Sequence, residues 1–167
     1  MTSRRLLVVV DESPASIRAI TYVAKIVGRH RDLRICLAHI LPQLPPRLLE
    51  FRGAEDPQKE QRLEARLKHR QQRWKAGAKK EAQRALGMAT ATLRRWGVCA
   101  GALDIQVSEG VEGVGAAERV LELARARQCD TVVVGRESVS WFRKLVRSNL
   151  AEELVHHGQR FTIWVVE

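Results

Sequence analysis

Three shortages in the sequence each exclude a class of protein. Its only cysteines, Cys36, Cys99 and Cys129, are odd in number, far apart and never in a Cys-x-x-Cys arrangement, which argues against a disulfide framework or a zinc site. We therefore expect reduced thiols in the core or at the surface. No apolar run approaches the roughly 20 residues that span a bilayer, and the N-terminal segment lacks a small-residue cleavage site. A soluble cytoplasmic protein without a membrane partner is expected.

Aromatic residues are also scarce, at 5% of the chain against 45% hydrophobic residues in total. This composition favours a core of Val, Leu, Ile and Ala, as in buried parallel sheets. The 167 residues fit one domain that encloses its core between two layers of helices. We expect a single domain over residues 1–167.

Acidic residues are outnumbered by basic ones, 19 against 29, which gives a formal net charge of +10. Most of the excess lies between Lys59 and Arg84, where three glutamates face ten basic residues: Lys59, Arg62, Arg66, Lys68, Arg70, Arg73, Lys75, Lys79, Lys80 and Arg84. One interpretation is a solvated helix face. The other is an arm that binds a protein or a polyanion such as nucleic acid, with Trp74 as an anchor.

Hydrophobic periodicity predicts five strands that alternate with helices. The strands are expected at 5–10, 33–41, 103–107, 131–134 and 161–166. Helices are expected after Ser13, which would be the N-cap with Pro14 in the first turn, and at 116–127 and 150–156. Residues 59–96 form one helix or two, with Gly77 and Gly87 as bends. In this stretch the part that packs on the sheet is predicted to contain Leu86, Ala89, Leu93 and Trp96.

This order predicts a doubly wound α/β fold, a single five-stranded parallel sheet with helices on both faces. The Pro-rich and basic stretch at about 43–80 differs in composition and is interpreted as a basic helical insertion. In such sheets ligands bind outside the carboxyl ends of the strands, where the strand order reverses. The sequence therefore predicts a nucleotide-sized cleft between Asp11 and Gly135.

A second pattern surrounds the fourth predicted strand. Val132-Val-Val-Gly135-Arg-Glu-Ser138 is followed by nine residues and then by Ser148-Asn149-Leu150. This spacing resembles the universal stress protein family, in which Gly occupies the positions of Gly135, Ser138 and Ser148 and a Ser or Thr follows the last. Landmarks at Asp11-Glu-Ser13-x-x-Ser16, Leu37-Ala-His39-Ile40 and Ile163-Trp-Val-Val166 extend the resemblance over nearly the whole chain.

The resemblance implies the strand order 3-2-1-4-5 of a flavodoxin-like, adenine nucleotide alpha hydrolase-like fold. It also implies a stress-response binding or signalling protein that holds ATP or a related nucleotide, with or without magnesium. The residues that match the family's adenine site are Val9, Asp11 and Ile40. Those that match its ribose and phosphate site are Gly135, Arg136, Ser138, Ser148, Asn149 and Leu150.

The phosphate side of this site departs from the family pattern, because only Gly135 of three motif glycines is present. Glycines let backbone N–H groups approach phosphate oxygens, and Asn149 with Glu152 forms a capping pair that places a carboxylate where phosphate would lie. Arg136, by contrast, would attract a polyphosphate. The alternative function is therefore a nucleotide-free dimeric scaffold that acts through protein contacts.

Other candidate residues have structural interpretations. Asp11 at a strand end is typical of a turn as well as of a ligand contact. His39 follows the strand alternation and is expected to be structural, whereas His156 and His157 are expected near helix-terminal carbonyls and not on a metal. No carboxylate pair is positioned by its spacing for acid/base catalysis, and no Walker-type motif is present, so the sequence predicts at most slow ATP hydrolysis.

The final predicted strand is an apolar edge, Thr162-Ile163-Trp164-Val165-Val166. The family resemblance implies that it pairs across a two-fold axis in a homodimer, with Trp164 as an interface anchor.

Overall fold

The computed structural model describes residues 4–27, 30, 32–50, 53, 56–110, 113–136 and 150–167. Its strands are β1 (Arg4–Val9), β2 (Leu33–Ile40), β3 (Leu103–Ser108), β4 (Thr131–Gly135) and β5 (Thr162–Val166). Its α-helices are α1 (Pro14–Val27), α2 (Pro57–Arg95), α3 (Ala116–Ala126) and α4 (Leu150–His157), and short 3-10 helices lie at η1 (Pro46–Leu48) and η2 (Ala100–Ala102).

The five strands form one parallel sheet in the order β3-β2-β1-β4-β5. Leu7 at the centre of β1 lies opposite Cys36 of β2 on one side and Val132 of β4 on the other. The chain leaves β1 toward β2 and later returns to the other side of β1 as β4. The predicted doubly wound fold and its strand order are therefore confirmed, and the order reverses beside β1.

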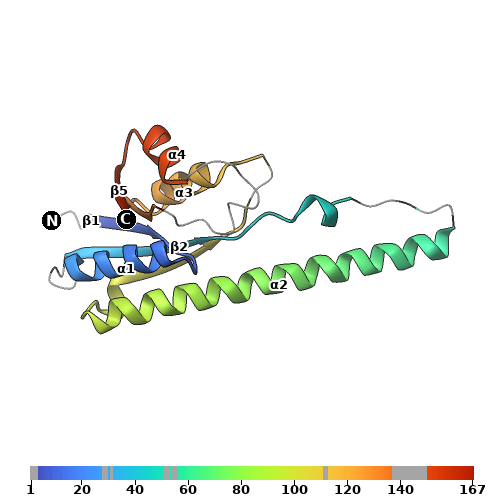
Figure 1. Cartoon of the computed structure of the whole chain (residues 1–167), viewed down its shortest axis with the longest axis horizontal. Coiled ribbons are helices and arrows are strands. Elements are labelled where there is room, and N and C mark those ends of the chain that lie inside the picture. Colours follow the sequence, from blue (N-terminus) through green and yellow to red (C-terminus); the bar gives the residue numbers. More distant parts are fainter. Residues whose placement is uncertain are drawn as a thin grey trace.

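Helices cover both faces of the sheet (Figure 1). Leu6 and Val8 point to the face covered by α1 and the C-terminal half of α2. Leu7 and Val9, which alternate with them, point to the face covered by α3 and α4. Because both faces are buried, β1 reads in sequence as a continuous apolar run and not as an alternating pattern.

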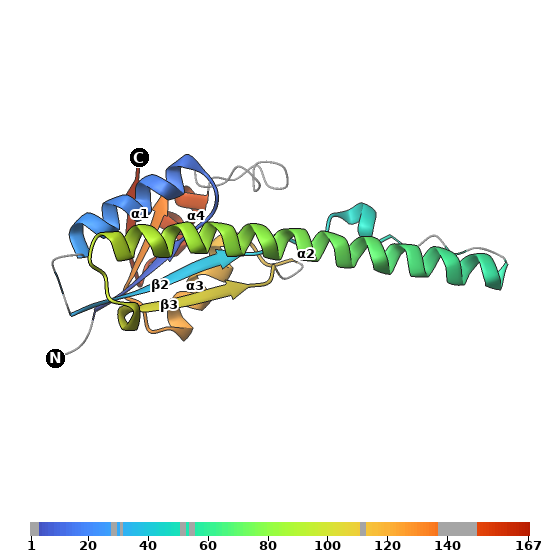
Figure 2. The same cartoon turned by 90° about the horizontal axis from the view of Figure 1, so that it is seen from below.

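Helix α2 is one unbroken helix of 39 residues whose N-cap, Asp56, accepts a hydrogen bond from the Gln58 backbone N–H. It continues through Gly77 and Gly87, so the sequence alternative of two helices is excluded. Its buried residues, Ala78, Ala82, Ala85, Leu86, Ala89 and Leu93, all lie in the C-terminal half. The N-terminal half projects beyond the sheet (Figure 2). That residues 43–80 are an insertion in a single domain stays a prediction.

Residues 41–50, here called the strap, run along the projecting half of α2 (Figures 1 and 2). Leu48 of the strap is buried, and its carbonyl accepts a hydrogen bond of 2.6 Å from the Gln71 amide. Trp74 and the strap residue Leu41 line a cavity of about 190 Å³ between the strap and α2. The strap thus covers one side of the projecting helix.

Two expectations about side-chain burial have different outcomes. Cys36 and Cys129 are buried free thiols and Cys99 is an exposed one, as predicted. Trp96, however, is 43% exposed, whereas Leu86, Ala89 and Leu93 are buried. The reason is that α2 ends at Arg95, and the chain turns at Gly97 with φ of 90°, a left-handed conformation that glycine adopts readily.

None of the helices in the described ranges combines the length and the apolar character that crossing a membrane requires.

Candidate functional site

The carboxyl ends of β2, β1 and β4 lie side by side at one edge of the sheet. This arrangement brings Ile40, Asp11 and Gly135 to the same end of the molecule, although they are far apart in sequence. Helix α1 begins at this edge, shortly after the end of β1. The structure therefore forms the strand-end geometry in which doubly wound proteins bind ligands.

Asp11 is buried and organises the turn between β1 and α1. Its Oδ1 accepts a hydrogen bond of 2.8 Å from the Ser13 N–H, and its own N–H donates to the Ser16 hydroxyl oxygen at 3.0 Å. The Ser13 hydroxyl in turn accepts from the Ser16 N–H at 3.1 Å, which confirms Ser13 as the helix cap. One Asp11 oxygen is thus engaged in a turn that leaves the second carboxylate oxygen at the strand end.

Val9 and Ile40 have buried side chains on the α3 and α4 face of the sheet. Val9 lies opposite Ala38 in the β1–β2 register, two residues before Ile40 on the same face. The structure therefore brings these two predicted adenine contacts together. Both side chains belong to the hydrophobic core that lies beneath the strand-end region.

Gly135 is required for a packing reason that its sequence motif does not reveal. A Cβ at this position would lie 2.5 Å from both the carbonyl carbon and the oxygen of Ala15. The first turn of α1 therefore rests directly against the end of β4. Gly135 has no positive φ, so its role is close helix–strand approach and not left-handed backbone.

Arg136 and Leu150 border the same end of the sheet. The Arg136 N–H donates to the Val166 carbonyl at 2.8 Å, and its guanidinium forms an exposed ion pair with the Glu167 carboxylate. Leu150 begins α4 with its side chain buried in the core, so only its backbone could face a ligand. Ser138, Ser148 and Asn149 lie outside the described residues.

The first turn of α4 carries two acidic residues, Glu152 and Glu153. Carboxylates at a helix N-terminus stabilise the helix through its dipole, and they repel a phosphate brought to the same place. The first turn of α1 has no acidic residue. The first turn of α1 is therefore the more favourable of the two for an anion, although the Asp11 carboxylate lies just before it.

His39 supports the end of β1 from the neighbouring strand. It is 4% exposed, and its Nδ1 donates to the Val10 carbonyl oxygen at 2.8 Å. This contact agrees with the predicted structural role. Burial lowers the pKa of His39 below its ordinary value, although the Val10 carbonyl and the Asp11 carboxylate oppose the shift. His39 is therefore neutral at pH 7.

The lowered pKa of His39 makes stability depend on pH in a defined direction. The unfolded chain takes up the proton at about pH 6.5, before the folded chain does, so the free energy of unfolding falls as pH drops below about 6.5 toward the folded-state pKa. His39→Asn keeps an N–H donor and removes the titration. Urea unfolding between pH 7.5 and 5 should show a shallower pH dependence for this variant, by up to about 1.4 kcal/mol per pH unit.

His69→Asn, at an exposed position on α2, removes a histidine outside the core and provides the matched control. Identical slopes for wild type and His39→Asn would contradict the buried, neutral histidine.

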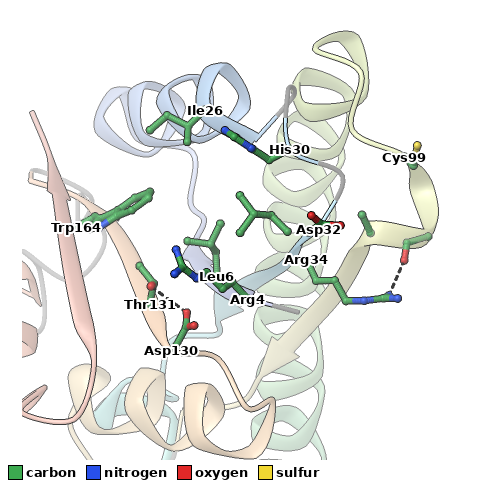
Figure 3. A pocket seen from close by; sticks show the side chains of 13 residues that line it. Arg4, Leu6, Ile26, His30, Asp32, Arg34, Cys99, Asp130, Thr131 and Trp164 are labelled. Atoms are coloured by element: carbon green, nitrogen blue, oxygen red, sulfur yellow. Dashed lines mark hydrogen bonds between the residues drawn. The ribbon is translucent and has the colours of Figure 1, made fainter. Parts of the chain in front are cut away.

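A large cavity, of about 830 Å³, lies at the opposite end of the sheet, around the amino ends of the strands (Figure 3). Leu6 and Trp164 contribute apolar surface, and Arg4, Asp32 and Asp130 contribute charges of both signs. Its thirteen lining residues include none of the nine predicted site residues. This cavity is therefore separate from the strand-end region.

Sequence reasoning missed two residues of the strand-end region. Ser16 appeared only as a landmark in the Asp11-x-Ser13-x-x-Ser16 spacing, which was the available signal for its bond to Asp11. Ala15 had no signal, because its contact with Gly135 joins segments 120 residues apart. Among the described residues, no group of three or more His, Cys, Asp or Glu side chains gathers that could hold a metal ion.

Comparison with known proteins supports the resemblance found in the sequence. The model of the universal stress protein family matches residues 2–160. A comparison with curated protein sequences found no match. Among solved structures, a universal stress family protein from Burkholderia pseudomallei has 20% identity and a TM-score of 0.63, with 98% of this chain and 96% of that chain covered.

Two further similar structures were solved as complexes with nucleotides. A universal stress protein from Archaeoglobus fulgidus in complex with dAMP has 15% identity and a TM-score of 0.57, with both chains covered fully. A universal stress protein in complex with cAMP has 14% identity and a TM-score of 0.58, with 100% of this chain and 98% of that chain covered. These likenesses show a shared fold, and the family model covers nearly all of the sequence. The chain therefore belongs to the universal stress protein family.

Proposed function

We propose that this protein is a cytoplasmic stress-response binding or signalling module that holds ATP or a related adenine nucleotide at the carboxyl ends of β1 and β4. The observation that carries the proposal is the Asp11 turn, which is buried, hydrogen-bonded and adjacent to Gly135 and the N-terminus of α1. Family members of the same fold were solved with cAMP and dAMP, and nucleotides of this kind suit such a strand end.

In this proposal the adenine lies near Val9, Asp11 and Ile40. The ribose and phosphates, with or without magnesium, lie near the segment that follows β4, at Gly135, Arg136, Ser138, Ser148, Asn149 and Leu150. The first turn of α1 contains no acidic residue, so the helix dipole there favours the negative charge. Among the site residues that the structure describes, no side chains are arranged for acid/base or nucleophilic catalysis. The protein therefore acts by binding, with at most slow ATP hydrolysis.

The homodimer remains part of the same proposal. β5 is the last strand of the sheet order, so its outer edge has no partner strand within the described residues. Such an edge is a template for pairing with a second copy. Trp164 of β5 packs edge-to-face on Tyr22 of α1, with ring centroids 6.3 Å apart, while Val165 is 39% exposed. Val165 is thus a better interface contact than Trp164.

If the homodimer forms, sedimentation equilibrium should give twice the mass of one chain.

The binding site is tested by Asp11→Asn. The substitution keeps an oxygen that can accept from the Ser13 N–H but removes the charge, so the fold should persist while ATP binding weakens roughly tenfold or more, the loss typical of one hydrogen bond to a charged group. Isothermal titration with ATP, with and without magnesium, measures the affinity. Asp130→Asn is the matched control, because Asp130 lies at the amino end of β4 beside the large cavity and should not affect binding.

Cys99 gives an independent readout of location. It is exposed and lines the large cavity, whereas the other two thiols are buried. ATP bound at the strand ends should leave the rate of Cys99 alkylation unchanged, while ATP in the large cavity would protect it. Native mass spectra without co-purified nucleotide, together with no saturable ATP binding, would contradict the proposal and favour the nucleotide-free scaffold.

A further inference from the structure

The projecting half of α2 carries a row of basic side chains on one side. Six of them recur at intervals of three, four or seven residues and are all exposed: Lys59, Arg62, Arg66, Arg70, Arg73 and Lys80. Intervals of this size keep side chains on the same face of an α-helix. These six residues, here called the basic row, occupy roughly a quarter of the helix circumference.

No carboxylate interrupts the basic row. The three glutamates of this segment fall at other steps of the helical repeat, and Glu64 forms an ion pair of 2.7 Å with Lys68, which is not part of the row. No member of the row forms an ion pair with another residue in the part of the chain that the structure describes. Arg84, the next basic residue along this face, is paired with Glu12 at 3.3 Å and marks where the row meets the body of the protein.

Apolar residues flank the basic row along one side of the helix. Leu63, Leu67 and Trp74 are half-buried, and Trp74 lines the cavity beneath the strap. Trp74 therefore packs in part against the strap side of the helix, and its role as an anchor for a partner stays a prediction. The basic row itself needs no such contacts for folding, because its members are exposed on a helix that projects away from the sheet (Figure 2).

The dimensions of the row fit a linear polyanion. From Lys59 to Lys80 the helix rises about 32 Å, at about 1.5 Å per residue. One turn of a B-form duplex is about 34 Å long and carries a phosphate charge every ~1.7 Å. A single strand would need aromatic side chains for base stacking, and a membrane would need apolar residues beside the charges. The row itself consists of cations only. Leu63 and Leu67 beside it are half-buried, and Trp74, the aromatic residue beside it, lines the cavity beneath the strap.

We propose that the basic row binds the phosphate backbone of a nucleic acid duplex without sequence preference. Guanidinium groups suit phosphate oxygens, and contacts of this kind position a protein on a duplex without reading its bases. This inference goes beyond the proposed nucleotide site and does not depend on it. Asp11→Asn should therefore leave duplex binding unchanged.

The test compares two triple variants that remove three positive charges each from the same helix. Arg66→Gln with Arg70→Gln and Arg73→Gln empties the centre of the row. Lys68→Gln with Lys75→Gln and Lys79→Gln removes three exposed charges that lie off the row. Glutamine is a good helix former, so far-UV circular dichroism should show the same helix content for both variants and wild type.

Binding is measured by fluorescence anisotropy with a 24-base-pair DNA duplex, an RNA duplex of the same length, a single-stranded DNA and vesicles that contain anionic lipid. We expect the row variant to lose roughly hundredfold in duplex affinity, and its plot of log K against log salt to flatten by about 2.7, at about 0.9 per phosphate contact. The off-row variant should lose less than about tenfold. The two duplexes distinguish DNA from RNA as the source of the phosphates.

Equal losses of duplex affinity from the two triple variants would contradict the proposal. They would mean that the overall positive charge of the helix, and not the row, binds the duplex. Wild type without duplex binding at 50 mM salt, or with tighter binding to vesicles or to the single strand than to either duplex, would overturn the proposal.

Discussion

Replacing Gly135 by alanine should lower the free energy of unfolding by about 3 kcal/mol, at the upper end of what overpacking costs in a core. The added Cβ would lie 2.5 Å from the Ala15 backbone, and backbone atoms at the start of a helix cannot rotate away as a side chain can. The first turn of α1 must therefore move off β4. Thermal unfolding should show a midpoint lower by roughly 10 °C for a chain of this size.

Gly77→Ala provides the control for this substitution. Gly77 lies inside α2 with nothing within 4 Å of an added Cβ, so alanine should raise the free energy of unfolding by about 0.5–1 kcal/mol through helix propensity. Unchanged stability of Gly135→Ala would mean that α1 and β4 do not approach as closely as described. Weaker ATP binding by Gly135→Ala at temperatures where it is folded would further support the site at this junction.

Replacing Leu93 by alanine should cost about 3 kcal/mol, as expected for a fully buried leucine. Leu93 is 0% exposed and packs α2 into the core that contains Val8, Val23 and Leu37. Because this end of α2 is the docked end, the loss leaves a cavity between the helix and the sheet. Urea unfolding followed by circular dichroism measures the change.

Leu67→Ala is the matched control, because Leu67 lies on the same helix in its projecting half and is only half-buried. This substitution should cost less than about 1 kcal/mol. A similar cost for the two leucines would indicate that the projecting half is held as firmly as the docked half, contrary to the described burial.

The strand ends could be predicted because each one carries a local signal. A buried apolar run followed by Asp11-Glu-Ser13-Pro14 specifies strand, turn and capped helix, and the structure has all three. The predicted packing of Trp96 on the sheet was wrong because helical periodicity does not show where a helix ends. The continuity of α2 was undecided, since the modest helix propensity cost of Gly77 and Gly87 can be offset by the surrounding helix formers.

The sequence by itself determined the family, the strand order that the family implies, and the excess of positive charge between Lys59 and Arg84. These features follow from spacing and periodicity, which are properties of neighbours along the chain. Only the tertiary structure decided why Gly135 is a glycine, where Trp74 points, and that six of the basic residues form one exposed row. The first two facts depend on the approach of Ala15 to β4 and of the strap to α2, contacts between segments that no local pattern relates. The row depends on α2 continuing unbroken through Gly77 and on its exposure beyond the sheet.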